Sequence, residues 1–211
     1  VKDPIGALLS FSGLTMYGGL ICASIACIWY GRKHQIPTPH LIDSCAPALM
    51  LAYGVGRIGC HVAGDGDWGD PNLLPKPNWL SWAPDWAWVY DYPHNVINEG
   101  VPLENCMQAK YCMHLVPAVF PTPLYEAIMC ITLFFVLWGI RKRITTPGVL
   151  FSIYLVLNGI ERFAIELIRV NTKYDVDGFQ FTQAQLISSI LIPLGIIGIL
   201  CFKRMEKKRI V

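Results

Sequence analysis

Long apolar stretches alternate with short polar segments along this chain, a pattern typical of membrane proteins. Residues 5–30 and 179–202 contain no Asp, Glu, Lys, Arg or His, and each stretch is long enough to cross a bilayer as a helix. Three weaker apolar stretches lie at residues 43–64, 122–140 and 147–168. The pattern therefore predicts an all-α integral membrane protein with five transmembrane helices.

The basic residues predict how these helices are oriented. If the five segments alternate in direction, ten of the 17 Lys and Arg residues fall on one side: Arg32, Lys33, Arg141, Lys142, Arg143, Lys203, Arg204, Lys207, Lys208 and Arg209. By the positive-inside rule, that side is cytoplasmic. The start of the chain then lies outside, directly before an apolar segment and without a cationic leader, so we expect further helices to precede it.

Composition divides the chain into three parts and excludes one class of function. Residues 1–65 carry the first two predicted helices, residues 66–121 form a long external loop, and residues 122–211 carry three helices and a basic tail. The loop holds five of the seven tryptophans, and such rings prefer the headgroup zone. We therefore expect an ordered aromatic-rich cap that is either purely structural or a lid or docking surface for a substrate. A net charge of only +2, with basic residues at helix ends, excludes a soluble nucleic-acid-binding protein.

Two arginines, Arg57 and Arg162, lie inside predicted helices, where a cation is costly and commonly marks a functional site. Four polar residues recur at spacings of four, four and three on one helix face, namely Asn158, Arg162, Glu166 and Arg169. Such a stripe should face protein or a wet cavity rather than lipid. In a purely structural interpretation each arginine neutralises a nearby carboxylate, with Glu161 and Glu166 available to Arg162.

The external loop contains a pair of cysteines, Cys106 and Cys112, six residues apart. Disulfides persist in the compartment predicted for this loop, so we expect these two thiols to be bonded. Two free thiols, or a metal site that includes His94 or His114, remain alternatives. The other six cysteines lie in or near predicted helices, where a thiol is usually a small apolar side chain.

Several short motifs occur in a fixed order along most of the chain. They are YGG at 17–19, GRIGCHVAGDGDWG at 56–69, PTPLYE at 121–126, NGIERFAIE at 158–166 and TQAQL at 182–186. As a set they resemble the bacterial prolipoprotein diacylglyceryl transferases. In that family the corresponding motifs are His-Gly-Gly, Gly-Arg-x-Gly-Asn-Phe-x-x-Gly-Glu-x-x-Gly, Pro-Ser-Gln-Leu-Tyr-Glu, Tyr-Gly-x-x-Arg-x-x-x-Glu and Thr-x-Gly-Gln.

The resemblance implies a fold and a reaction. The family fold has seven transmembrane helices with a periplasmic head and side arms, so five helices here would mean that the first two are absent. The implied enzyme is a multi-pass protein of the bacterial cytoplasmic (inner) membrane with its active site toward the periplasm. It would transfer the diacylglyceryl group of phosphatidylglycerol to the lipobox cysteine of a prolipoprotein and release glycerol 1-phosphate.

The resemblance also implies roles for individual residues. Arg57 and Arg162 would bind the phosphate as catalytic residues, with Glu166 orienting Arg162. Residues implied to bind substrate or line the site are Gly18, Gly19, Cys60, Asp67, Gly69, Tyr125, Glu126 and Asn158. The implied partners are phosphatidylglycerol, prolipoprotein signal peptides and membrane lipid; the expected enzyme is a monomer without a metal or organic cofactor.

This chain departs from the family at the position of the proposed general base. Tyr17 replaces the family histidine, Cys60 replaces the asparagine, and Asp65, or Asp67 with a one-residue insertion, replaces the glutamate. A neutral tyrosine is a poor base at neutral pH. His61, one turn after Arg57, is a second candidate. A carboxylate or the substrate phosphate is the third, and the three alternatives remain open.

Two other functions compete with the transferase. A catalytically silent, lipid-binding homologue would keep the fold and the arginines, and the Tyr17 substitution favours it. A small-anion transporter would use Arg57 and Arg162 as a relay, but it predicts broken helices in repeated halves. The sequence contains no such repeat.

Overall fold

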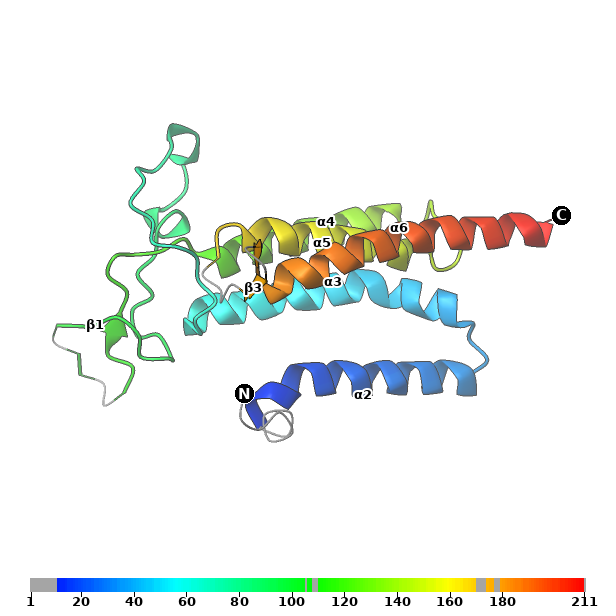
Figure 1. Ribbon diagram of the computed structural model, residues 1–211, viewed down its shortest axis with the longest axis horizontal. Coiled ribbons are helices and arrows are strands. Elements are labelled where there is room, and N and C mark those ends of the chain that lie inside the picture. Colours follow the sequence, from blue (N-terminus) through cyan, green and yellow to red (C-terminus); the bar gives the residue numbers. More distant parts are fainter. Residues whose placement is uncertain (1–10, 105, 108–109, 170–173, 177–178, 211) are drawn as a thin grey trace.

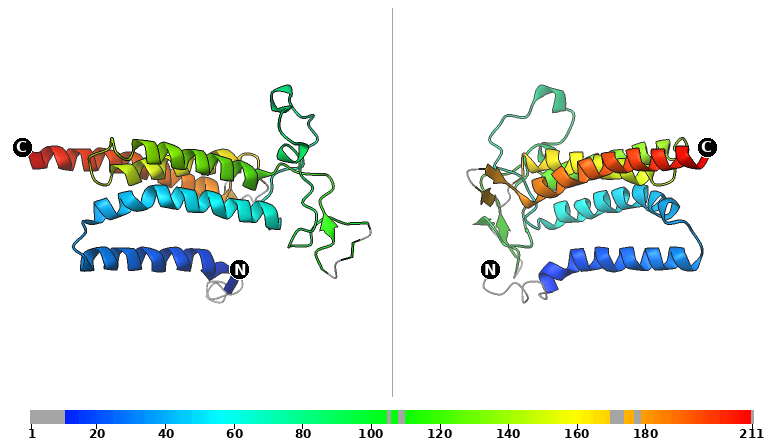
Figure 2. Two further views of the ribbon diagram at one scale, coloured as in Figure 1. Left: turned by 180° about the vertical axis from the view of Figure 1, so that it is seen from behind. Right: turned by 45° about the vertical axis from the view of Figure 1, so that its right-hand side comes forward.

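The computed structural model describes residues 11–104, 106–107, 110–169, 174–176 and 179–210. Its five helices are α2 (Phe11–Lys33), α3 (Thr38–Ala63), α4 (Thr122–Ile140), α5 (Val149–Glu166) and α6 (Gln183–Ile210). Helices α3, α4, α5 and α6 form an elongated bundle, with α2 alongside α3 at its edge (Figure 1). The last turns of α6 extend beyond the other helices (Figure 2).

Helix boundaries agree with the apolar pattern at some positions and differ at others. Helix α4 has the predicted bounds, whereas α3 begins at Thr38 rather than residue 43, because Pro37 and Pro39 fit the start of a helix. Helix α6 begins at Gln183 rather than residue 179. The reason is that β4 (Phe179–Phe181) pairs with β3 (Tyr174–Val176) in an antiparallel hairpin. The predicted start of the first helix, residue 5, lies outside the described residues.

By length and composition, three segments among the described residues can cross a membrane: Thr38–Ala63, Thr122–Ile140 and Ala184–Lys208. Helix α5 is long enough but carries Glu161, Arg162 and Glu166. These charges lower its hydropathy, and their placement toward the bundle explains why such a helix can lie among apolar neighbours.

Close backbone contact joins α5 to α6. A Cβ added to Gly195 would lie 2.6 Å from the Ser152 carbonyl oxygen, and one added to Gly159 would lie 2.8 Å from Cγ1 of Ile192. Small residues at such positions allow helices to approach closely in membranes. Reciprocal hydrogen bonds fix the start of α6, because the Thr182 amide donates to Gln185 Oε1 and the Gln185 amide donates to Thr182 Oγ1.

The segment between α3 and α4 projects from one end of the bundle (Figure 1). It contains two single turns, η1 (Asn78–Leu80) and η2 (Asp85–Ala87), and two short paired strands, β1 (Val101–Pro102) and β2 (Met113–His114). Its own buried cluster consists of Trp68, Tyr92, Leu115 and Val119. The structure contains the Cys106–Cys112 disulfide in this segment. The segment thus has local order despite having little regular secondary structure.

Candidate active site

Three arginines meet around one carboxylate where the bundle joins the projecting segment. Glu126, near the start of α4, pairs through Oε2 with Nε of Arg57 from α3. Its Oε1 lies 3.0 Å from Nη1 of Arg162 on α5 and 3.6 Å from Nη1 of Arg169, just after α5. Glu126 is 1% exposed. One buried carboxylate therefore links all three guanidinium groups.

Asp67 forms a second bridge between two of these arginines. Its Oδ2 pairs with Nη1 of Arg57, and its Oδ1 pairs with Nη2 of Arg169. The Asp67 carbonyl accepts a hydrogen bond of 2.8 Å from Thr122 Oγ1 at the start of α4. These contacts fix the loop after α3 against the other helices.

Tyr53, which the sequence analysis did not single out, completes the cluster. Its hydroxyl oxygen lies 3.2 Å from Nη2 of Arg57 and 3.0 Å from Nη1 of Arg162. The Arg57 guanidinium also lies over the Tyr53 ring, 5.1 Å from its centre. The spacing of four residues between Tyr53 and Arg57 on one helix is the signal that could have identified it.

Arg169 reaches the site because two backbone segments pass very close together. The Asp70 amide donates to the Ile168 carbonyl at 3.0 Å, and Gly69 forms an isolated bridge with Arg169. A Cβ on Gly69 would lie only 2.7 Å from the Ile168 carbonyl oxygen. Gly69 therefore acts through the backbone, by allowing the segment that carries Arg169 to dock.

The guanidinium groups of this cluster offer hydrogen-bond donors to an anion. Three guanidinium groups face two bridging carboxylates, Glu126 and Asp67, and two further carboxylates, Asp65 and Glu166, lie nearby. Nε and Nη1 of Arg169 are buried and make no hydrogen bond to any described residue. The Arg162 side chain is 24% exposed, compared with 10% for Arg57 and 7% for Arg169. A phosphate could contact Arg162 directly, while the positive charges of Arg57 and Arg169 lie deeper in the site.

Among the described ion pairs, Arg162 does not pair with the carboxylates that the purely structural interpretation offered it. Its described ion pair is with Glu126 on a different helix, not with Glu161 or Glu166 on its own. Glu161 is 1% exposed, and neither of its oxygen atoms has a hydrogen-bond partner among the described residues. Glu166 is buried one turn after Arg162, and Asn158 is half-buried one turn before it.

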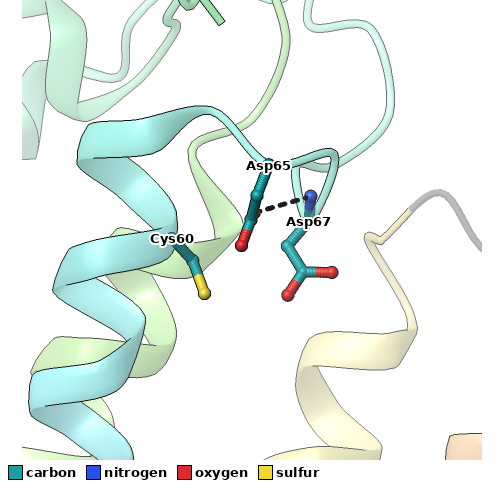
Figure 3. Close-up of side chains that lie close together, drawn as sticks. All are labelled: Cys60, Asp65 and Asp67. Atoms are coloured by element: carbon teal, nitrogen blue, oxygen red, sulfur yellow. Dashed lines mark hydrogen bonds between the residues drawn. The ribbon is translucent and has the colours of Figure 1, made fainter. Parts of the chain in front are cut away.

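Cys60, Asp65 and Asp67 lie close together at the end of α3 (Figure 3), and Asp67 connects them to the arginine cluster. One potential ligand atom from each falls within 4.8 Å of the others. The Asp67 amide donates to Asp65 Oδ1 at 3.3 Å, and Cys60 Sγ lies 3.8 Å from Nη1 of Arg57. Asp67 is already paired with two guanidinium groups, which repel a metal cation. The contacts of the Asp67 carboxylate are therefore ion pairs with arginines.

His61 faces the projecting segment instead of the arginine cluster. Its Nδ1 is 3.1 Å from the Tyr92 hydroxyl, and its ring lies 5.3 Å from the Tyr90 ring and 6.1 Å from the Trp86 ring. Burial raises the pKa of Tyr92, so that hydroxyl stays protonated and can donate a hydrogen bond. These contacts assign His61 an anchoring position between α3 and the aromatic residues.

Three other predicted residues also lie apart from the arginines. The Tyr125 hydroxyl donates to the Ala87 carbonyl at 3.0 Å and so contacts the projecting segment. Gly18 and Gly19 are on α2 at the edge of the bundle, and a Cβ on Gly19 would meet no atom within 4 Å. The side chain of Tyr17 lies outside the described residues.

Comparison with known proteins agrees with the ordered motifs. Residues 4–201 match the family described as prolipoprotein diacylglyceryl transferase. Relatives named phosphatidylglycerol–prolipoprotein diacylglyceryl transferase include those of Leptospira interrogans (29% identical, 95% of this chain, 63% of the relative) and Dehalococcoides mccartyi (28%, 96% and 66%). A relative of the same name from Clostridium tetani is 30% identical over 88% of this chain and 62% of its own length. This chain thus spans less than two thirds of the length of these relatives. With nearly its whole length matched, the chain belongs to the prolipoprotein diacylglyceryl transferase family.

Proposed function

We propose that the arginine cluster binds the phosphodiester of phosphatidylglycerol and promotes transfer of its diacylglyceryl group to a cysteine thiol. The observation that carries the proposal is the convergence of Arg57, Arg162 and Arg169 on Glu126. The names of the relatives supply the substrate class, phosphatidylglycerol and a prolipoprotein.

The charge of the cluster suits this reaction. The thiol sulfur forms a bond to the glycerol carbon of the diacylglyceryl group, and the bond from that carbon to the phosphate oxygen breaks. The leaving oxygen keeps the electron pair, so the phosphate changes from a monoanion to the dianion of glycerol 1-phosphate once the thiol proton has gone to a base. Guanidinium groups fixed before the reaction stabilise this developing charge. Arg162, the most exposed of the three arginine side chains, is the one best placed to contact the phosphate.

Asp65 is the carboxylate best placed to accept the thiol proton. Both oxygens of Asp67 and both oxygens of Glu126 are already engaged by arginines, so neither carboxylate faces an incoming thiol with a free oxygen. Asp65 is exposed, lies beside Cys60 and forms no ion pair among the described residues. His61 is turned toward Tyr92. We therefore assign the proton to Asp65, with Glu166 and Asn158 supporting Arg162 from the same helix face.

The same proposal includes an orientation in the membrane. All five helices would cross the bilayer, with the arginine cluster and residues 66–121 on the periplasmic side of the bacterial inner membrane. Helix ends at the opposite side carry Arg32, Lys33, Arg141 and the basic residues of α6, which supports this direction. Prolipoprotein signal peptides, the second substrate, would then reach the site from the bilayer. The enzyme would act as a monomer.

A transfer assay tests the function. The full chain in lipid nanodiscs is mixed with phosphatidylglycerol labelled in its acyl chains and with a lipobox peptide containing one cysteine. We expect the label on the peptide with wild-type protein, and at least a hundredfold less with Arg162→Lys, because a single ammonium group cannot replace the planar fork. Near wild-type turnover of Arg162→Lys would contradict phosphate binding by Arg162. Lipid binding without transfer by wild type would instead support the catalytically silent homologue.

A further inference from the structure

A cavity lies at the opposite end of the bundle from the arginine cluster. It has a volume of about 390 Å³ and lies between the first turns of α3 and the turn that joins α4 to α5. Pro47 and Leu150, both buried, form its apolar floor. Arg141, at the end of α4, and the exposed His40 contribute its polar rim. The cavity therefore combines an apolar floor with a polar rim that includes Arg141.

Arg141 is held in place without a carboxylate. Its guanidinium carbon lies 3.4 Å from the centre of the Trp138 ring, and Nη1 donates to the Trp138 carbonyl. No acidic side chain in the described part of the chain forms an ion pair with Arg141. Stacking on Trp138 thus orients the positive charge but leaves it electrostatically uncompensated.

Asp43 lines the same cavity, but its charge is used elsewhere. Its Oδ2 accepts from the Gly148 amide at 2.6 Å, and its Oδ1 accepts from the Phe151 amide at 2.8 Å. These amides belong to the start of α5, where a helix carries partial positive charge. Asp43 therefore caps the start of α5 from α3, and it forms no ion pair with Arg141 among the described contacts.

The surroundings of Arg141 match a phospholipid better than a free ion. Trp138 is 48% exposed and Phe135, on the same helix, is 64% exposed, so an apolar track leads from the cavity along the outside of α4. An exposed tryptophan beside an arginine at a helix end is typical of the headgroup level of a membrane. A ligand with a phosphate and acyl chains can contact both the guanidinium and this track at once.

We propose that this cavity binds the phosphate of an anionic phospholipid from the leaflet opposite to the arginine cluster. The inference does not depend on the transfer reaction. Arg141 contacts the phosphate, the rim of the cavity accommodates the glycerol, and the acyl chains follow α4 past Phe135. The bound lipid stabilises the turn between α4 and α5.

Native mass spectrometry of the full chain in detergent tests the site. The protein is titrated with dioleoylphosphatidylglycerol, with the zwitterionic dioleoylphosphatidylcholine and with inorganic phosphate. We expect Arg141→Gln to weaken one phosphatidylglycerol binding event about fivefold, the typical effect of one basic residue at an anionic surface. Arg143→Gln is the matched control, because Arg143 is exposed, carries the same charge two residues away and does not line the cavity.

Two further comparisons separate this cavity from other sources of binding. Arg162→Gln should remove a different lipid, so the losses in the Arg141→Gln/Arg162→Gln double variant should add. Arg141→Lys retains the positive charge and should keep most of the phosphatidylglycerol binding. That result would show that the cavity tolerates substitution at this position. Equal binding by the Arg141→Gln and Arg143→Gln variants would overturn the proposal. Equal affinity for phosphatidylcholine, or full competition by inorganic phosphate, would also overturn it.

Discussion

Arg57 and Arg162 bind opposite oxygens of a single carboxylate, that of Glu126. Arg57 reaches Oε2 from α3, and Nη1 of Arg162 on α5 lies 3.0 Å from Oε1, while Glu126 itself belongs to α4. Three helices are therefore joined by ion pairs at the point where the proposed substrate phosphate binds. The same contacts that fix the helices also position the charges before any substrate arrives.

Two buried glutamates with different surroundings provide the first prediction. Glu126→Gln leaves three guanidinium groups around one remaining carboxylate, and loss of one partner from a buried ion pair typically costs about 3–5 kcal/mol. We expect a loss of that size in the free energy of unfolding and a fall of roughly 10²-fold in transfer rate, as for other charge-positioning groups. Chemical denaturation and the transfer assay measure the two effects.

Glu161→Gln is the matched control, because Glu161 is equally buried but has no described hydrogen bond. We expect its transfer rate to stay within about threefold of wild type, since removing an unpaired group leaves no partner unsatisfied. If both glutamine variants lost activity equally, the loss would follow from substituting any buried glutamate. The bridging role of Glu126 would then be wrong.

The second prediction concerns Arg169, which the motif comparison left outside the site. Arg169→Lys keeps a charge near Asp67 but cannot pair with Asp67 and Glu126 through separate nitrogen atoms. We expect transfer to fall by about tenfold or more, mainly as a raised apparent KM for phosphatidylglycerol. Lys110→Arg, at an exposed position in the projecting segment, should have no effect. Unchanged kinetics for Arg169→Lys would remove Arg169 from the phosphate site.

The third prediction distinguishes the proton acceptor from the anchor. Asp65→Asn removes the carboxylate beside Cys60 that forms no described ion pair, so transfer should fall by roughly 10²- to 10⁴-fold, the usual contribution of a positioned base. His61→Gln can still hydrogen-bond to Tyr92, so it should reduce the rate by less than about tenfold. Single-turnover transfer rates decide between the two. The reverse order of effects would make His61 the base.

The fourth prediction tests the contact between α5 and α6. Gly195→Ala places a methyl group 2.6 Å from both Ser152 O and Val156 Cγ2, so the helices must separate, and overpacking of this kind costs about 1–3 kcal/mol. Gly139→Ala, in α4, meets no atom within 4 Å and should be neutral or slightly stabilising. Thermal unfolding in detergent measures the Tm of both variants. Equal Tm values would show that α5 and α6 accommodate the added methyl group without separating.

Much of the helical framework could be predicted from the sequence, because long apolar runs have few alternatives in a membrane. The start of α6 could not, since the apolar run from Phe179 continues through a hairpin whose pairing with Tyr174–Val176 is a tertiary contact. Arg57 and Arg162 were identifiable as isolated charges in apolar helices. Their shared partner, Glu126, became evident only once α3, α4 and α5 were placed together.

Arg169 and His61 show why motif spacing alone was insufficient for the site. Arg169 was part of the predicted polar stripe, but its approach depends on Gly69 and the backbone bridge, which join segments far apart in sequence. His61 follows Arg57 by one turn, yet the aromatic cluster of the projecting segment holds its ring away from the arginines. Local helix geometry could not reveal either outcome.

The most direct test of the central claim is the stoichiometry of the products. Wild-type protein is incubated with phosphatidylglycerol and a cysteine lipobox peptide, and mass spectrometry measures the thioether-linked diacylglyceryl peptide and free glycerol 1-phosphate. The proposed reaction predicts equal amounts of both products, and neither from Arg162→Lys or from a serine peptide. Release of glycerol 1-phosphate without modified peptide, or no product while lipid remains bound at the arginine cluster, would contradict it.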